Sequence, residues 1–200
     1  HVTGEAGRKL KIHLEDGTAV DGISLGLDHF SDAGMAQITE PGKWPYRRIA
    51  RASSFKAGDW SIAMGHPGGM MIRRKTPLRL GKIIFCDVLG TGEMTTDCTI
   101  ISGDSGGPLF NLKGEVIGIN SSISGSIRGN THVPIDIFLS TWEKLKSGEE
   151  TGSASPGSYH PRVKAFRREL EKRLDESQYV KLKKSWQFLT QRQIQRYLND

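Results

Sequence analysis

Apolar and polar side chains alternate in short stretches through the first part of the chain. Between residues 8 and 27, Leu10 and Ile12 share one face, and Asp16-Gly17 is a favoured pair for a tight hairpin turn. Short strand-like segments follow at residues 35–38, 60–65, 78–85, 94–100, 107–111, 115–120 and 131–135, most of them separated by Gly, Pro or Asn. Regularly spaced short strands with turn residues between them predict a β-barrel or a β-sandwich.

The last third of the chain has a helical pattern instead. Residues 136–147 place Phe138 and Trp142 four positions apart, within a pattern that predicts one short amphipathic helix. Residues 147–161 are small and polar and contain two prolines, a composition typical of a flexible linker. Apolar residues recur every three or four positions again in 162–200, which predicts a basic, amphipathic helical tail.

Charge separates the same parts of the chain. The 200 residues carry 28 basic and 22 acidic side chains, a formal net charge of +6. Residues 1–146 hold 17 and 15 of them, 147–161 hold none and 2, and 162–200 hold 11 and 5, so the basic excess lies in the tail. Acidic residues interleaved there are typical of a solvated helix face, and we expect no nucleic-acid partner. No apolar run approaches the roughly 18 residues that a membrane span needs.

The segment with the clearest chemistry is Gly-Asp-Ser-Gly-Gly at 103–107, between two strand-like stretches. Gly103 and Gly106 allow a turn tight enough to expose the Ser105 hydroxyl. The backbone N–H groups of Gly103 and Ser105 can then converge on one point, as the donors of an oxyanion hole do. This pattern indicates a serine nucleophile with its oxyanion hole beside it.

The chain here resembles the trypsin-like serine proteases, and among them the bacterial HtrA/Deg-like branch. The resemblance is centred on GDSGGPLFNLKGEVIGINS (103–121), extends back through 58–69 and 76–83, and covers most of residues 1–146. It implies a mainly β fold of two six-stranded antiparallel barrels, here followed by an α-helical extension. The tail is too short and too helical for the PDZ domain that usually follows. We therefore expect a protease domain at 1–146, a linker at 147–161 and the tail at 162–200.

A serine hydroxyl needs an imidazole to take its proton and a carboxylate to orient that imidazole. In this family the order is His, Asp, Ser, which the resemblance places at His1, Asp32 and Ser105. Asp28 is the rival carboxylate. Two other histidines, His13 and His29, fit ordinary strand or surface positions better. The family has several strands before its catalytic histidine and this chain has none, so the first barrel is expected to be incomplete.

The resemblance also implies the substrate pocket. It places the floor near Thr99, one side near Ile100, and the far wall near Ser121, Ser122 and residues 130–133. A pocket with no acid at its floor favours small or aliphatic side chains over Arg or Lys. An alternative is that His132 and Thr99 together accept an acidic side chain.

Asp104, the two cysteines and His66 have further interpretations. Asp104 stands where digestive trypsins have a carboxylate that pairs with a newly cut amino terminus, and we interpret it as hydrogen-bonded structure. Cys86 and Cys98 lie nearly symmetrically about Gly92, which slightly favours a disulfide over two buried thiols. His66 fits a turn better than a metal site, and we expect no metal and no cofactor.

The sequence thus predicts a serine endopeptidase that hydrolyses peptide bonds through an acyl-enzyme intermediate. Its expected substrates are polypeptides, which it cleaves after small or aliphatic residues. The alternative is a protease-like binding module without activity. The helical tail at 162–200 is a candidate for self-association or partner docking. An extracytoplasmic compartment, periplasmic or secreted, is weakly favoured.

Overall fold

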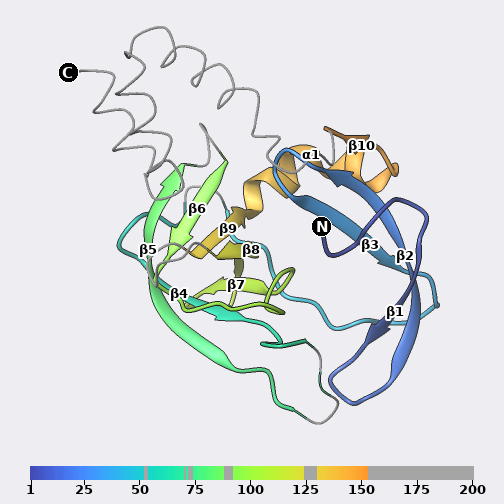
Figure 1. Cartoon of the computed structure of the whole chain (residues 1–200), viewed down its shortest axis with the longest axis horizontal. Helices are drawn as coiled ribbons and strands as arrows, with labels where there is room; N and C mark the ends of the chain where they lie inside the picture. The colour runs from blue at the N-terminus through green and yellow to red at the C-terminus, as the bar shows by residue number, and fades with distance from the viewer. Residues whose placement is uncertain (52–53, 70, 72–73, 88–91, 124–129, 153–200) are drawn as a thin grey trace, which may run out of the picture. The chain divides into compact units, whose positions relative to one another are not determined.

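The computed structural model of the chain is mainly β and describes residues 1–51, 54–69, 71, 74–87, 92–123 and 130–152 (Figure 1). Its elements in chain order are β1 (Lys9–His13), β2 (Ala19–Asp28), β3 (Ala33–Ile38), β4 (Trp60–Met64), β5 (Leu78–Asp87), β6 (Glu93–Thr96), β7 (Pro108–Asn111), β8 (Val116–Ile123), β9 (Asn130–Pro134), α1 (Ile135–Lys146) and β10 (Glu150–Thr151). No helix in this described part is long and apolar enough to cross a membrane.

The first sheet is built around the long strand β2. It pairs antiparallel with β1 and β3, and parallel with the short β10. The predicted hairpin joins β1 to β2: the Leu14 N–H donates to Thr18, and Gly17 takes a φ of +87°, which a glycine adopts without strain. Across the described residues this sheet has four strands and is not closed, as expected for an incomplete first barrel.

The second sheet is a closed barrel with the strand order β4-β5-β6-β9-β8-β7. Every neighbouring pair of strands is antiparallel. Its interior is filled by side chains that are almost fully buried, among them Ile83, Met94, Leu109 and Ile117. Closure pairs both edges of the sheet and so leaves no free edge strand. The barrel and the open sheet confirm the predicted double-barrel fold.

Helix α1 lies against both sheets, and Figure 1 shows it (orange) between the blue strands and the green barrel. It buries Phe138 and Leu145 on one face. Close packing on β2 requires Gly26, because a Cβ there would lie 2.7 Å from the backbone of Leu145. The predicted helix is therefore confirmed, and it begins directly after Pro134, whose fixed φ suits the start of a helix.

The chain does not become a linker at residue 147. After α1 it returns to β2, where the Leu27 N–H donates to the carbonyl of Glu149 and the His29 N–H to that of Thr151. These backbone bonds form β10. The sequence did not predict this strand, because the segment is small and polar and a two-residue strand has no hydrophobic period. The remainder of the predicted linker and the 162–200 tail lie outside the described residues.

The disulfide favoured by the sequence is not formed. The β5–β6 register places Cys86 opposite Met94 and Ile83 opposite Thr96. Cys98 lies beyond the end of β6 and is therefore not the cross-strand partner of Cys86. Its buried thiol lies 3.4 Å from the Ser61 hydroxyl.

Candidate active site

The predicted nucleophile lies on a tight turn, residues 101–107, between β6 and β7. The Asp104 N–H donates to Ile101 at 3.0 Å, and the Gly107 N–H donates back to Asp104 at 3.0 Å. Gly103 and Gly106 take φ values of +96° and +81°, in the left-handed region that favours glycine. Two glycines and two short backbone bonds thus give the turn its shape.

Some backbone donors of this turn are left for a ligand. The N–H groups of Asp104, Gly106 and Gly107 all donate to backbone carbonyls. The N–H groups of Ser102, Gly103 and Ser105 have no acceptor within the described part of the chain. Gly103 and Ser105 are the two residues that the sequence assigns to an oxyanion hole, and the unpaired donors are compatible with that assignment.

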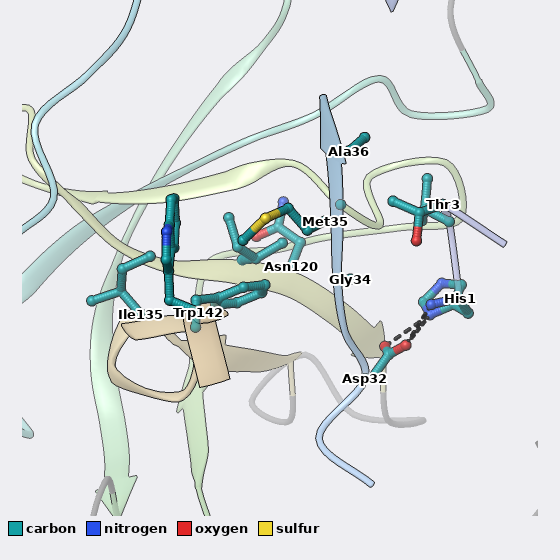
Figure 2. A pocket seen from close by; sticks show the side chains of 13 residues that line it. His1, Thr3, Asp32, Gly34, Met35, Ala36, Asn120, Ile135 and Trp142 are labelled. Carbon is teal, nitrogen blue, oxygen red and sulfur yellow. Dashed lines mark hydrogen bonds and ion pairs between the residues drawn. The ribbon is translucent and has the colours of Figure 1, made fainter. Parts of the chain in front are cut away.

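His1 and Asp32 form the histidine–carboxylate pair predicted from the sequence (Figure 2). The His1 Nδ1 lies 2.8 Å from both carboxylate oxygens of Asp32, and the amino nitrogen of His1 lies 2.7 Å from Oδ1. Asp32 has a φ of +59° and is the one non-glycine residue of the described chain with a positive φ. Such backbone strain is typical of functional sites, and Asp tolerates it better than most residues.

Ser121 on β8 joins this pair to the serine. Its hydroxyl donates to Asp32 Oδ2 at 2.6 Å, and its backbone carbonyl accepts the Ser105 hydroxyl at 3.1 Å. The Ser105 hydroxyl therefore points to Ser121 and not to the His1 ring. Val2 follows His1 and packs beside the turn, with its side chain 3.4 Å from where a Cβ on Gly106 would lie. The structure thus gathers His1, Asp32 and Ser105 around Ser121.

Asp28, the rival carboxylate, is used elsewhere. It accepts the Ser31 hydroxyl at 2.6 Å and the Thr151 hydroxyl at 3.0 Å, next to β10. His13 is exposed on β1, and His29 donates its backbone N–H to Thr151. All three lie in the first sheet or at the end of its strand β2, and ordinary strand or surface positions were the preferred interpretation of His13 and His29.

A cavity of about 350 Å³ opens beside the His1–Asp32 pair. Figure 2 shows the pair at one end of it, with Met35 between them and the α1 side chain of Trp142. The N-terminal segment, β3, β8, α1 and Gly106 contribute its lining. The cavity is therefore shaped jointly by the open sheet, the barrel and the helix. Trp142, which the sequence placed only in the apolar pattern of the helix, is half exposed there.

The predicted pocket residues have different surroundings. Thr99 and Ser122 are exposed, Ile100 is buried, and Ser121 holds Asp32. His132 is 1% exposed and lies inside the barrel, so the structure does not bring it to a surface.

His132 belongs to a buried polar chain that sequence reasoning missed. The Asn120 amide nitrogen donates to the carbonyls of Met64 at 2.7 Å and Asp104 at 3.1 Å. Its oxygen must then accept from Nδ1 of His132 at 3.0 Å, which leaves Nε2 to accept the Thr96 hydroxyl at 2.8 Å. Burial lowers the pKa of His132 to about 4, so the ring is neutral near pH 7. This chain fixes the carbonyl of the residue before Ser105.

The turn at His66–Gly69 supports the other side of the serine turn. The Gly68 N–H donates to the Ser102 carbonyl at 2.7 Å, and a Cβ on Gly103 would lie 2.5 Å from the backbone of Gly69. His66 itself accepts the Gly69 N–H through its carbonyl, which confirms the interpretation of this histidine as a turn residue. Asp104 is confirmed as hydrogen-bonded structure, since its carboxylate accepts the Ile101 N–H at 2.8 Å.

A serine on a glycine turn, an adjacent histidine–carboxylate pair and a closed antiparallel barrel define a site of the serine-hydrolase class. Comparison with known proteins gives the family: the trypsin-like peptidase domain matches residues 1–119, and the chain belongs to it. A probable DegP-like periplasmic serine endoprotease of Ectopseudomonas mendocina is 33% identical over 153 residues, covering 74% of this chain and 32% of that protein. The putative serine protease HhoA of Synechocystis is 34% identical, covering 70% and 37%.

Solved structures agree on the fold. A serine endoprotease from Yersinia pestis has a TM-score of 0.59 at 24% identity, covering 69% of this chain and 48% of that one. The HtrA-type protease AlgW, solved with a decapeptide, has a TM-score of 0.62 at 24% identity, covering 75% and 47%. The chain spans about a third of the length of the curated relatives it matches.

The buried neutral His132 predicts an acid-sensitive fold. Its pKa is about 4 in the folded chain against an ordinary 6.5, so the unfolded chain binds more protons between these values. The unfolding free energy should therefore fall by about 3 kcal/mol as the pH drops from 6.5 to 4. Urea unfolding at a series of pH values measures this slope, and His132→Gln should flatten it. The exposed His13→Gln is the matched control; an equal flattening in both variants would contradict the assignment.

Proposed function

We propose that this chain is a serine endopeptidase that uses His1, Asp32 and Ser105 as its catalytic triad. The observation that carries the proposal is the hydrogen-bonded path from the His1 ring through Asp32 and Ser121 to the Ser105 hydroxyl. A histidine held by a carboxylate beside a serine on a tight glycine turn is the arrangement that activates a serine hydroxyl.

The geometry assigns a role to each ring nitrogen of His1. Nδ1 faces the Asp32 carboxylate, so Nε2 is the nitrogen available to Ser105. Rotation of the Ser105 hydroxyl away from Ser121 brings its proton to Nε2 as Oγ attacks the substrate carbonyl carbon. The Asp32 carboxylate stabilises the imidazolium that forms. Because Nδ1 contacts both carboxylate oxygens, the ring orientation is set before substrate arrives.

The N–H groups of Gly103 and Ser105 complete the reaction site. The carbonyl oxygen of the substrate gains negative charge as the tetrahedral intermediate forms, and these two donors stabilise it. The imidazolium of His1 then gives its proton to the leaving amine, which departs and leaves an ester on Ser105 Oγ. Water, deprotonated by His1, attacks that ester in the second half of the reaction and restores the serine.

Polypeptides are the proposed substrate class, and an extracytoplasmic compartment is the proposed location. Relatives named as periplasmic serine endoproteases, including DegQ of Escherichia coli at 35% identity, support both. The cavity beside His1, lined by residues that include Asp32, Gly106 and Trp142, is the space next to the proposed base.

A preference for small or aliphatic side chains is the proposed specificity. Thr99, Ile100, Ser121 and Ser122 carry no charge, and a binding pocket without a carboxylate gives no partner to Arg or Lys. The alternative is an acidic side chain accepted by Thr99 and His132. It requires the His132 ring to bind substrate, although this ring is buried and hydrogen-bonded at both nitrogens.

Replacement of the nucleophile tests the reaction. Ser105→Ala should lower the hydrolysis of a peptide ester by at least about 10⁴-fold, because no acyl-enzyme can form without the hydroxyl. Ser140→Ala, an exposed serine on α1, is the matched control and should keep the full rate. Release of the alcohol is followed by absorbance. Equal rates for Ser105→Ala and the parent chain would refute the triad, and an inert parent chain would favour the binding-module alternative.

A library of peptides that differ only at the residue before the cleaved bond tests the specificity. Val, Ala and Leu should be cleaved fastest, with kcat/KM at least about 10-fold above that for Arg or Lys, a difference of about 1.4 kcal/mol. Mass spectrometry of the products gives the cleavage positions. Preferential cleavage after Glu would overturn this preference and favour the acidic-substrate alternative.

A further inference from the structure

The carboxylate of Asp104 is the most deeply buried charge beside the proposed nucleophile. Its side chain has no exposed surface, and Oδ2 accepts the Ile101 N–H at 2.8 Å. The same oxygen lies 3.2 Å from Nη2 of Arg79, a residue on β5. Two donors therefore converge on one oxygen of Asp104, one from the turn itself and one from the barrel wall.

Arg79 approaches the turn from a rigid position. Its backbone pairs with Ala63 in the β4–β5 ladder, and its side chain is only 18% exposed. Nη1 of Arg79 and Oδ1 of Asp104 are both buried without a hydrogen-bond partner within the described residues. The ion pair is thus the main compensation for each charge, and each charge depends on the other.

Asp104 is closely packed against two glycines. A Cβ on Gly65 would lie 2.4 Å from Oδ1, and one on Gly107 would lie 3.0 Å from the Asp104 carbonyl. Without the guanidinium, a buried carboxylate would keep the Ile101 N–H alone, which is a strongly unfavourable state for an ion. Relief would require the side chain to turn toward water, and the backbone of the turn would have to move with it.

That backbone carries the two donors of the proposed oxyanion hole. Asp104 lies between Gly103 and Ser105. The Ser105 N–H belongs to the peptide bond that follows Asp104, so a rotation of the Asp104 backbone redirects it and changes its orientation relative to the Gly103 N–H. The Asn120 amide holds the Asp104 carbonyl at 3.1 Å but makes no contact with its carboxylate. A hydrogen bond to the Asp104 carbonyl supplies no cation to the Asp104 carboxylate. The Asn120–His132 hydrogen bonds therefore do not substitute for Arg79.

We propose that Arg79 is a positioning residue for catalysis: through its ion pair with Asp104 it sets the orientation of the Gly103 and Ser105 N–H groups. This inference rests on the proposed function and deepens it, since it assigns a role to a residue that contacts no substrate. Donors displaced by about 1 Å lose much of their effect on the transition state but little of their effect on ground-state binding.

The test compares Arg79→Met, Arg79→Lys and the double variant Arg79→Met/Asp104→Asn with the parent chain on a peptide ester. Rates are divided by the number of active sites titrated with a fluorophosphonate. Arg79→Met should lower kcat per site about 10- to 100-fold while KM changes less than about 3-fold. The double variant should recover most of that loss because no buried charge remains unpaired, and Arg79→Lys should retain more activity than Arg79→Met.

Lys11→Met is the matched control, because it removes a cation from the exposed Lys11–Asp21 pair and should leave kcat unchanged. Thermal unfolding of every variant separates stability from positioning. An Arg79→Met variant with a kcat per titrated site within about 2-fold of the parent would overturn the inference, and so would a double variant that regains thermal stability without regaining kcat. If the parent chain itself neither reacts with the fluorophosphonate nor hydrolyses the ester, the proposed function fails instead.

Discussion

The carboxylate of Asp32 is the contact on which the arrangement of the site depends. It comes from the loop before β3, on the open sheet, and it accepts the hydroxyl of Ser121 from the closed barrel at 2.6 Å. Both its oxygens also face the His1 ring at 2.8 Å. One carboxyl group therefore orients the proposed base and joins it to the strand that receives the Ser105 hydroxyl. The positive φ of Asp32 is an unfavourable backbone conformation, and these contacts hold the residue in it.

The barrel supplies the rigidity that such a contact needs. The 101–107 turn is held from three directions: by the His66–Gly69 turn, by the Asn120 amide and by the Arg79 guanidinium. None of these groups is part of the triad, yet each contacts Ser102 or Asp104 in the turn that carries Ser105. Closed strand pairing behind them keeps their positions fixed. Helix α1 adds Phe138 and Trp142 to the cavity beside Asp32 and packs against both sheets.

The sequence allowed the strands, the hairpin at Asp16-Gly17 and the helix to be predicted, because hydrophobic periodicity and turn residues are local signals. The Gly-Asp-Ser-Gly-Gly motif indicated Ser105, and the family resemblance indicated His1 and Asp32; the triad itself stays a prediction. Contacts between distant segments were not accessible in the same way. Nothing local in the sequence pairs Arg79 with Asp104, or Asn120 with His132. The Cys86–Cys98 prediction was wrong because the strand register pairs Cys86 with Met94. Likewise, β10 has only two residues and no periodicity to detect.

Ser121 illustrates the same limit at the site. Its place after the Gly-Ile-Asn segment suggested a pocket wall, whereas its hydroxyl bonds to Asp32. A short strand exposes alternate side chains to opposite faces, so one residue of register decides between these roles. The residue types near a site can be read from a motif, but their partners follow from strand pairing.

The most direct test of the central claim, that Asp32 holds His1 ready to activate Ser105, is the rate of covalent reaction with a fluorophosphonate, with the modified peptide located by mass spectrometry. The account predicts one adduct per chain, on Ser105, and a reaction slowed on the order of 10⁴-fold in Asp32→Asn, where the amide can no longer stabilise the imidazolium. An adduct on another residue, or an Asp32→Asn variant that reacts as fast as the parent chain, would contradict it.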